Sequence, residues 1–581
     1  IMNPVAFLSI TDESKTTTLF AASDFEHDLT SNLTATVNGE FSQESTDRGF
    51  YLPRTTNNSN LPDGAAQKGN AEVTNYGAEA YMTYRGTVGE GDLLLVGGTG
   101  IYKAGTEGSS VQGVGFFTDA FTYNNIGVAS DQLRNSISSY KSGRTKLSQF
   151  ARANYTLRDR YIFSLLARRD GSSIFAENHQ WGIFPGASAA WILSEEGFFA
   201  NALPAVSFLK LRAGYGEAGN ESILSGNSLQ LYSPGYPFLL GNTVYSGVAL
   251  SQVANPDLTW ETVETVNLGV DFGLFDDRLR GSLDFFSKTA VDLLDFNPLP
   301  SNNPVGRVAD NVGSTRSRGF ELTLAASPIQ RSRLRWDASF NVSHSVGRWV
   351  ERNPLTNLPS YVDGDAPLDA IYGWETDGVI QTEADRPAHM PDAQLGNTIY
   401  RDQNGDGELN EDDVIVIGNG TPRWRFGLGS TLAVGDVSLS AFVYANVDYD
   451  RGNTYNPSLF DIRQPTAPNN TTTYAEDIWS HDNPDGTLPG VASNPYSNQN
   501  PADNDNFNLY DASFLRLRNV SLSYQVPPSW LSRIGAETAR LVLDLQDLGV
   551  VTSYPGFDPE FTEANPYPKA YTLTIGAEVG F

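Results

Sequence analysis

The sequence predicts an all-β protein, specifically a transmembrane antiparallel β-barrel with about 17 strands. Apolar and polar residues alternate in segment after segment, which gives each predicted strand one apolar and one polar face. The segments come in pairs joined by short turns, whereas long polar connections join one pair to the next. Short turns at one end of the strands and long loops at the other are typical of outer-membrane barrels.

The C-terminal segment YTLTIGAEVGF is the clearest example of this alternation. From Tyr571 to Phe581 every second residue is apolar, and the residues between them are polar or small. The last residues of a soluble protein usually fray, but here the pattern continues to the final position. We therefore expect the chain to end in a strand that has one apolar side.

The composition is compatible with this architecture. Hydrophobic residues make up 40% of the chain, and the longest apolar runs fall short of the roughly 18 residues of a membrane helix. A barrel does not need such runs, because its apolar residues occupy every second position. The 26 Tyr, 31 Phe and 54 Gly residues suit strands and aromatic girdles. The absence of cysteine excludes disulfides, cysteine-zinc clusters and thiol nucleophiles.

The formal net charge of -29 argues against nucleic acid as a partner, because a phosphate backbone requires a basic surface. This charge fits acidic surface loops, and it also fits simple solubility. The net charge alone does not separate these two interpretations.

Paired strands are recognised from their turns. In VNLGVDFGLFDDRLRGSLDFF, alternation on either side of a short Asp-Asp turn predicts a hairpin. Segment 512–526 changes phase, since Leu515 and Leu517 fall on the opposite face from Val520 and Leu522, and we expect a β-bulge there. The predicted strands are 16–24, 32–43, 71–85, 92–102, 146–157, 160–169, 181–194, 207–216, 262–274, 278–290, 315–327, 333–346, 424–433, 436–447, 512–526, 538–547 and 570–581.

The alternation also assigns faces. The residues expected to face lipid are Leu268, Val270, Leu428, Leu439, Leu543 and Ile575, and those expected to face the lumen are Asn267, Asp271, Ser440, Asp544 and Glu578.

The long connections, expected on the extracellular side, lie at about 103–145, 217–261, 348–422 and 449–511. Single-chain bacterial barrels have an even number of strands, so the odd count predicts that these residues form part of a larger barrel. We find no plug domain in the sequence.

One of these loops contains the spacing of a calcium-binding loop, DQNGDGELNEDD. Asp402, Asn404 and Asp406 stand at positions 1, 3 and 5, Glu408 at position 7 and Asp413 at position 12. Such a spacing brings hard oxygen ligands together around one cation, and the glycine at position 6 allows the sharp turn. We expect a structural Ca²⁺ at these five residues. An acidic turn without an ion is the alternative.

No other motif indicates a cofactor or a catalytic site. The stretch GYGEAG fits G-x-G-x-x-G, but no helical pattern follows it, so small residues in a barrel strand are the better explanation. The five histidines are scattered, and no carboxylate pair is singled out. Tyr474 and Trp479 are weak candidates for stacking on a sugar ring, although ordinary loop packing explains them equally well.

Five segments, in order, resemble the SusC/RagA-like family of TonB-linked outer-membrane proteins. They are RYIFSLLARRDGSSIFAENHQWGIFPGASAAWILSEEGFF, LKLRAGYGEAGN, NPDLTWETVETVNLGVDFGLFDDRL, RDQNGDGELNEDDVIVIGNGTPRWRFGL and DASFLRLRNVSLSYQVP. The resemblance implies a Gram-negative outer-membrane barrel of about 22 strands with a plug, of which this chain would be the C-terminal part. It implies TonB-driven import of glycan or peptide oligomers with a SusD-like surface lipoprotein.

Two other functions fit the same residues. A passive porin would share the barrel but would have no plug. A calcium-stabilised secreted β-protein, either an adhesin or a glycan-active protein, would bury its apolar faces in a closed core.

Overall fold

The computed structural model describes most of the chain. Residues outside the description are 1–5, 7, 57–60, 62, 132–133, 200–202, 223–227, 236, 242, 354–357, 363, 453–476, 491–493, 497–500, 503–504, 507–508, 533–534, 557 and 562–568.

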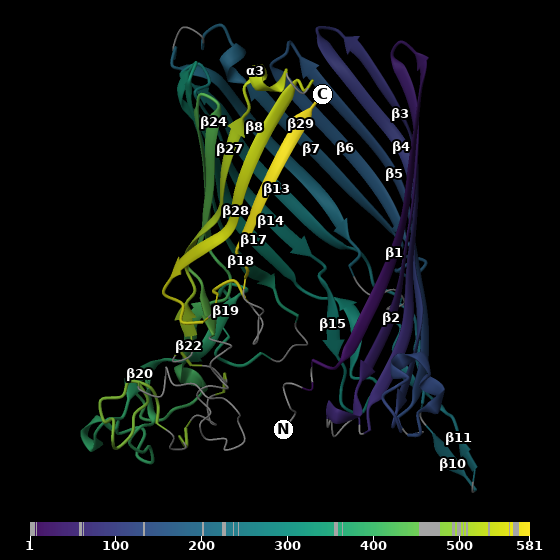
Figure 1. Cartoon of the computed structure of the whole chain (residues 1–581), viewed down its shortest axis with the longest axis vertical. Helices are drawn as coiled ribbons and strands as arrows, with labels where there is room; N and C mark the ends of the chain where they lie inside the picture. Colours follow the sequence, from purple (N-terminus) through teal and green to yellow (C-terminus); the bar gives the residue numbers. More distant parts are fainter. Residues whose placement is uncertain are drawn as a thin grey trace. The chain divides into compact units, whose positions relative to one another are not determined.

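Seventeen strands belong to one antiparallel sheet, and each overlaps one of the predicted segments (Figure 1). The strand assignment from sequence is therefore confirmed. These strands are β1 (Thr11–Thr30), β2 (Leu33–Leu52), β3 (Ala65–Val88), β4 (Gly91–Val114), β5 (Ser136–Leu157), β6 (Tyr161–Ser172), β7 (Trp181–Ile192), β8 (Val206–Asn220), β13 (Glu261–Leu274), β14 (Leu279–Val291), β17 (Ser314–Arg331), β18 (Leu334–Glu351), β23 (Trp424–Val434), β24 (Val437–Val447), β27 (Phe514–Gln525), β28 (Thr538–Thr552) and β29 (Thr572–Gly580).

The connections contain six small two-stranded sheets. Their strands are β9 (Leu231–Pro234), β10 (Phe238–Leu240), β11 (Thr243–Tyr245), β12 (Val248–Gln252), β15 (Leu294–Pro298), β16 (Arg307–Asn311), β19 (Ala370–Trp374), β20 (Thr376–Val379), β21 (Thr398–Tyr400), β22 (Val414–Asn419), β25 (Asp450–Gly452) and β26 (Leu509–Asp511). One short α-helix, α3 (Pro528–Leu531), and several 3-10 turns complete the described elements. No helix in the described residues has the length and apolar character needed to span a membrane.

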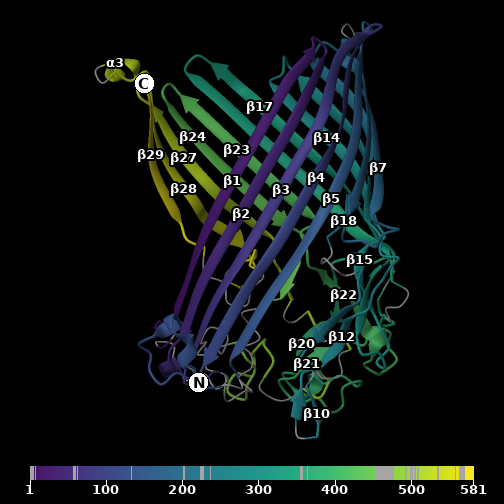
Figure 2. The same cartoon turned by 90° about the vertical axis from the view of Figure 1, so that its right-hand side faces the viewer.

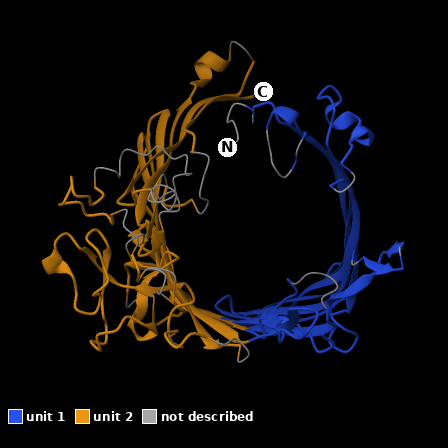
Figure 3. Cartoon of the chain, turned by 90° about the horizontal axis from the view of Figure 1, so that it is seen from below, with its two compact units in different colours: residues 1–189, 215–264, 291–312 blue, residues 190–214, 265–290, 313–581 orange. Residues whose placement is uncertain are grey.

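The chain divides into two compact units, coloured in Figure 3. Unit 1 comprises residues 1–189, 215–264 and 291–312, and unit 2 comprises residues 190–214, 265–290 and 313–581.

In unit 1 the strands from β1 to β6 form a meander, each pairing with the next in the chain (Figure 2). The turn between β5 and β6 places Arg158 and Asp159 at φ 52° and 54°. Positive φ at successive turn residues gives the twist that matches the strands of a hairpin.

Strands β3 and β4 have 24 residues each, whereas the alternation predicted 15 and 11 residues. The connection between β4 and β5 therefore covers residues 115–135, which is shorter than the predicted 103–145. The ends of these strands are rich in Thr, Ser, Gly and Glu on both faces, so the apolar alternation fades while the backbone pairing continues.

In unit 2 a second meander joins β17, β18, β23, β24, β27, β28 and β29. The register of β27 shifts between Leu517 and Asn519, against both β24 and β28. The β-bulge predicted from the phase change in this segment is confirmed.

Cross-strand register in unit 2 separates an apolar row from a polar row. The apolar row runs through Leu432, Leu439, Leu522, Leu543 and Ile575, each paired with the next. The adjacent polar row runs through Thr431, Ser440, Ser521, Asp544 and Thr574. Successive residues of a strand point to opposite faces, so the two rows lie on opposite sides of the sheet.

The apolar row is uncovered. Leu439 is 46% exposed and Ile575 is 78% exposed, and none of the hydrophobic clusters described in unit 2 includes a residue of this row. In water, such a continuous apolar surface would cost about 25 cal/mol for each Å². The exposure favours a face solvated by lipid over the closed core that a secreted β-sandwich requires.

Single cysteines at Leu439 and Ser440 test this assignment, because the native chain contains no cysteine. A polarity-sensitive dye on Leu439→Cys should be quenched by brominated lipid acyl chains, whereas the same dye on Ser440→Cys should not. The measurement is steady-state fluorescence after reconstitution in bilayers. Equal quenching at the two neighbouring positions would contradict the face assignment.

Candidate functional site at the loop-bearing ends of the strands

The described parts of two long connections of unit 2 fold together into one small subdomain. Its core contains Trp374, Ile380, Met390, Tyr400 and Val414 from the β18–β23 connection, and Trp374 is fully buried. Figure 1 shows β19, β20 and β22 beyond the loop-bearing ends of the long strands. A hydrophobic core of its own makes this connection a folded platform, as expected for a long loop that carries function.

The β24–β27 connection completes the platform. Thr376 donates from its backbone N–H and its hydroxyl to Oδ1 of Asn506, at 2.8 and 2.7 Å. The backbone N–H of Gly490 donates to the carbonyl of Gly396 at 2.6 Å. These bonds cross more than 90 residues of sequence, so the two loops hold each other in place.

The acidic loop predicted to bind calcium lies within the platform. The N–H groups of Gly405 and Gly407 donate to the two carboxylate oxygens of Asp402, at 2.7 and 2.8 Å. Both glycines have positive φ, 76° and 87°. Asn404 and Asp406 accept bonds from backbone N–H groups two residues further on, at 2.9 and 2.8 Å. The structure therefore gives this loop the tight successive turns that the spacing predicts.

The last predicted ligand has a different environment. Asp413 is fully buried, and its carboxylate accepts the N–H groups of Gln403 and Asn410, both at 2.8 Å. Within the described part of the chain, no three or more His, Cys, Asp or Glu side chains are grouped so that they could hold a metal ion. Calcium at Asp402, Asn404, Asp406, Glu408 and Asp413 therefore remains a prediction.

The backbone donors lower the pKa of Asp402, chiefly through the N–H of Gly407 and, less strongly, that of Gly405. The folded-state pKa lies below the value of 3.8 for a free carboxyl group. The ionised group stabilises the loop above the unfolded pKa, and this contribution is lost as the pH falls through the lower folded-state value.

The two aromatic candidates for sugar binding differ in what the structure describes. Tyr474 lies outside the described residues. Trp479 is only 7% exposed, and its ring packs against His481 at a centroid distance of 5.3 Å. A β-carbon on Gly396 would meet this ring at 2.4 Å, so the glycine makes room for it. Trp479 is thus part of the platform's interior and does not present a face for stacking on a sugar.

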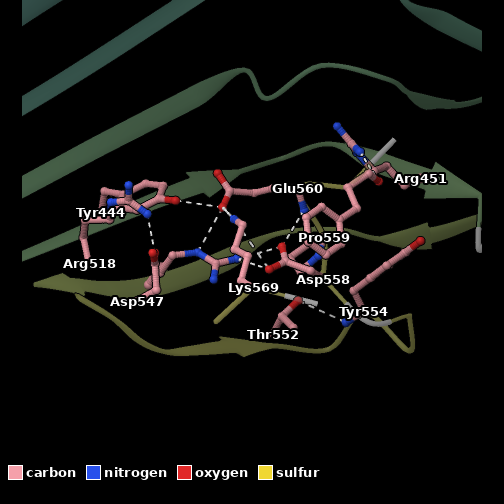
Figure 4. Close-up of polar contacts among 12 residues, drawn as sticks. Tyr444, Arg451, Arg518, Asp547, Thr552, Tyr554, Asp558, Pro559, Glu560 and Lys569 are labelled. Atoms are coloured by element: carbon pink, nitrogen blue, oxygen red, sulfur yellow. Dashed lines mark hydrogen bonds and ion pairs between the residues drawn. The ribbon is translucent and has the colours of Figure 1, made fainter. Parts of the chain in front are cut away.

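A buried ionic cluster joins β27 to the β28–β29 connection (Figure 4). Arg516, on β27, is 3% exposed in its side chain and donates to both carboxylate oxygens of Asp558 at 2.7 Å. Its Nε lies 3.0 Å from Oε2 of Glu560. Lys569 donates to Glu560 at 2.6 Å, and the Tyr444 hydroxyl donates to the same carboxylate at 2.7 Å. Two cations thus balance two carboxylates, and the cluster leaves no net charge.

The cluster ties the β28–β29 connection to β24 and β27. The Tyr449 hydroxyl donates to the carbonyl of Pro559 at 3.0 Å, and Arg451 donates to the carbonyl of Phe561 at 2.7 Å. Burial raises the pKa of Tyr449 to about 12, so this hydroxyl stays protonated and remains a donor. Lys569 stands three residues before the start of β29, so the cluster holds the chain close to the beginning of the last strand.

We did not find this ionic cluster from the sequence. Its only signal in the sequence is Arg516, in the otherwise apolar start of the strand segment FLRLRNV. The partner of Arg516, Asp558, lies 42 residues further along the chain.

Unit 1 carries an apolar double hairpin in the β8–β13 connection. Strand β9 pairs with β12 and β10 pairs with β11. The large apolar side chains that are mostly exposed there are Leu229, Tyr232, Phe238, Leu239, Leu240, Val244 and Val248, at 52 to 68%. Several large apolar side chains left exposed on one short loop structure favour an interaction site.

The polar face of unit 2 carries paired charges. Arg212 donates to both carboxylate oxygens of Asp284, at 2.6 and 2.7 Å, and to Asp271 at 3.1 Å. Lys210 lies 3.2 Å from Asp271. A β-carbon on Gly269 would lie 2.5 Å from the guanidinium carbon, so this glycine leaves space for the network. The predicted polar residues Asn267 and Asp271 both join it, opposite the exposed Leu268.

Comparisons with known proteins agree with this architecture. A family model described as TonB dependent receptor-like, beta-barrel matches residues 3–548. TonB-dependent receptor P3 of Formosa agariphila is 30% identical, over 100% of this chain and 58% of the receptor. SusC of Bacteroides thetaiotaomicron is 27% identical, over 88% of this chain and 51% of SusC.

Among solved structures, the RagAB peptide transporter superposes with a TM-score of 0.82 at 22% identity, covering 98% of this chain and 62% of that chain. The chain thus spans half to three fifths of the length of these relatives. The 17-stranded antiparallel sheet and the matched family model place the fold in the β-barrel class of outer-membrane receptors. The chain belongs to the TonB-dependent receptor family, in its SusC-like branch.

Removing the buried cation of the ionic cluster tests its role in holding the last loop. Arg516→Met leaves the carboxylates of Asp558 and Glu560 buried with less compensation, which should cost about 3–5 kcal/mol. We expect a lower urea midpoint for unfolding in detergent and faster proteolysis between β28 and β29.

Arg540→Met is the matched control, because Arg540 and its partner Glu578 are 53% and 73% exposed. An exposed pair contributes about 0–1 kcal/mol. Equal effects of the two substitutions would show that burial of the ionic cluster does not matter.

Proposed function

We propose that the chain forms part of a TonB-powered importer that takes up nutrient oligomers together with a SusD-like surface lipoprotein. The apolar double hairpin of the β8–β13 connection is the observation that carries this proposal. Burying such side chains against a partner yields about 1.5–3 kcal/mol each, whereas leaving them in water yields nothing.

The folded loops support a partner of this kind. The described residues of the platform have their own core, and a buried ionic cluster holds the described part of the last loop without any partner. Preorganised loops lose less conformational entropy on binding, so more of the contact energy appears as affinity. A passive porin, the alternative, has no need of an ordered docking surface on its loops.

The cargo is best explained as a neutral or weakly charged oligomer, either a glycan or a peptide. The polar row of unit 2 carries hydroxyls, and the charges near Arg212 are compensated by Asp271 and Asp284. With a net charge of -29, the chain also disfavours strongly anionic cargo. The RagAB transporter, whose fold this chain shares, takes peptides.

Two substitutions in the hairpin test the partner surface. Leu239→Ser with Val244→Ser removes two paired, mostly exposed apolar side chains without touching the long strands. We expect the lipoprotein to be lost from pull-downs of the full-length receptor in native membranes, and uptake of the oligomer to fall with it.

Phe117→Ser is the control, because Phe117 is 68% exposed in a different connection of the same unit. It should leave the lipoprotein bound. Recovery of the receptor alone from wild-type membranes, with full uptake in cells lacking the lipoprotein, would exclude the paired importer. Comparing growth on glycan and peptide fractions then assigns the cargo.

We also propose that Ca²⁺ binds the acidic loop, with Asp402, Asn404, Asp406, Glu408 and Asp413 as ligands. Two observations support this proposal. Gly405 and Gly407 both have positive φ, and their N–H groups donate to the carboxylate of Asp402. Hard carboxylate and amide oxygens at this spacing are what calcium prefers. The ion would hold the platform in one conformation.

Asp406→Ala should abolish calcium-dependent protection of the 348–422 connection against protease while the sheet remains folded. Asp412→Ala is the control, because Asp412 is exposed in the same loop and is not among the proposed ligands. Isothermal titration with calcium provides the second measurement. If neither calcium nor a chelator changes the protease sensitivity of the wild type, the loop is an acidic turn only.

A further inference from the structure

The apolar face of unit 1 carries a groove with a lysine at one end, which we call the capped groove. It has a volume of about 510 Å³ and lies across β1 to β4. Its floor contains Ala21, Gly39 and Ala78, and its walls include Phe41, Tyr76 and Ile101. Cross-strand pairing places Ala21, Phe41, Tyr76 and Lys103 in one row, with Gly39, Ala78 and Ile101 in the next row towards the short turns.

Lys103 is the cation of this groove. It is exposed, and among the described residues it forms no ion pair. Two acidic groups on the same face, near Lys103 on the loop side, are engaged elsewhere. Glu107 binds Lys141 at 2.6 Å, and Glu72 accepts bonds from Gln43 and Thr74 at 2.8 and 3.2 Å. Glu40 also borders the groove, but its side chain lies over Gly77 on the opposite face.

A second cation on this face, Arg169, also lies next to an aromatic residue. Cross-strand register places Arg169 on the face of Ala80 and Thr99. Its guanidinium lies over the ring of Trp181, 4.1 Å from the centroid. Arg169 lies nearer the short turns than Lys103, because Thr99 in its row is four residues closer to Gly91 on β4. Lys103 is paired with Tyr76, and aromatic residues with Lys or Arg gather where the hydrocarbon of a membrane meets its headgroups.

The position of Lys103 along its strand agrees with that boundary. Lys103 lies 12 residues from Gly91, at the short turn, because 103 minus 91 is 12. At about 3.3 Å per residue and a tilt of about 45°, this distance spans roughly 28 Å. The hydrocarbon core is about 25–30 Å thick, so the lysine reaches the far headgroup layer.

We propose that the capped groove binds an anionic lipid, with one acyl chain along Gly39 and Ala78 and its phosphate on Lys103. The proposal rests on membrane insertion of the sheet, which is part of the proposed function. An unpaired cation at the end of an apolar groove, at headgroup depth, fits a phosphate that is attached to an acyl chain.

The same face offers an internal comparison. A larger groove of about 720 Å³, near the short turns, is lined by Met82, Leu95, Gly97, Ala151 and Leu165. Arg152 also borders it, but its Nε donates to Asn154 at 3.1 Å and alternation places its side chain on the polar face. This second groove therefore provides apolar surface without a cation.

Native mass spectrometry of the detergent-purified full-length receptor tests the proposal. Titration with phosphatidylglycerol should show one retained lipid, and phosphatidylcholine should bind more weakly. Lys103→Met should weaken phosphatidylglycerol about five-fold, the factor expected for one basic residue at a membrane surface. Gly39→Leu should remove the retained lipid, and a β-carbon at Gly39 would meet nothing within 4 Å.

Two variants serve as controls. Gly97→Leu adds bulk in the second groove. The nearest atom to a β-carbon at Gly97 would be the carbonyl oxygen of Phe150, at 3.9 Å. Lys68→Met removes an exposed lysine further towards the loops on the same strand pair. Both should retain the lipid.

Equal binding of the two lipids, or unchanged binding in Lys103→Met, would overturn the proposal. Displacement of the lipid by millimolar inorganic phosphate would also overturn it, because that result assigns a phosphate-only site. The hairpin variant Leu239→Ser/Val244→Ser should keep the lipid while losing the lipoprotein. Failure of the importer proposal is thereby distinguishable from failure of the lipid site.

Discussion

In hydrocarbon, every backbone N–H and C=O must find a partner within the protein, because no water is present to bind it. The long strands satisfy this requirement by unbroken pairing. All 20 residues of β2 are paired with β3, and all 24 residues of β3 with β4. Once the register is fixed, a slip of one residue would turn every apolar side chain to the polar face. Strand register determines the apolar row from Leu432 to Ile575 and the polar row on the opposite side of the sheet in unit 2. It also determines the two grooves of unit 1.

The ends of the strands follow a different rule. Beyond the apolar face, water can bind the backbone, so the chain is free to form loops, small sheets and a subdomain with its own core. Arg516 is buried with Asp558 and Glu560 there. The close partner of opposite sign that each charge has offsets its desolvation penalty. It holds a loop that backbone pairing does not reach.

Much of the sheet could be predicted from the sequence, because alternation is a local signal. The 17 strands and the bulge near Leu517 follow from it directly. The strand ends could not be predicted, since β3 and β4 continue with polar residues on both faces. The contacts of Arg516 and Trp479 were also out of reach, because they join segments that are distant in sequence and obey no periodic rule. Calcium remains a prediction from spacing, with Asp413 already bonded to two backbone N–H groups.

The length of β3 has one more consequence. At the depth proposed for Lys103, the residues of β3 from Tyr76 back to Ala65 would continue beyond the headgroup boundary, and 11 residues at about 3.3 Å and a 45° tilt would add roughly 25 Å of height. The connections that follow β2 and β4 would therefore stand on a stalk of paired strands, clear of the lipid surface. A protein that docks on such raised loops makes its contacts in water. A change in bilayer composition would then affect the membrane-embedded part of these strands. A change in the docking partner would affect only their ends beyond the lipid.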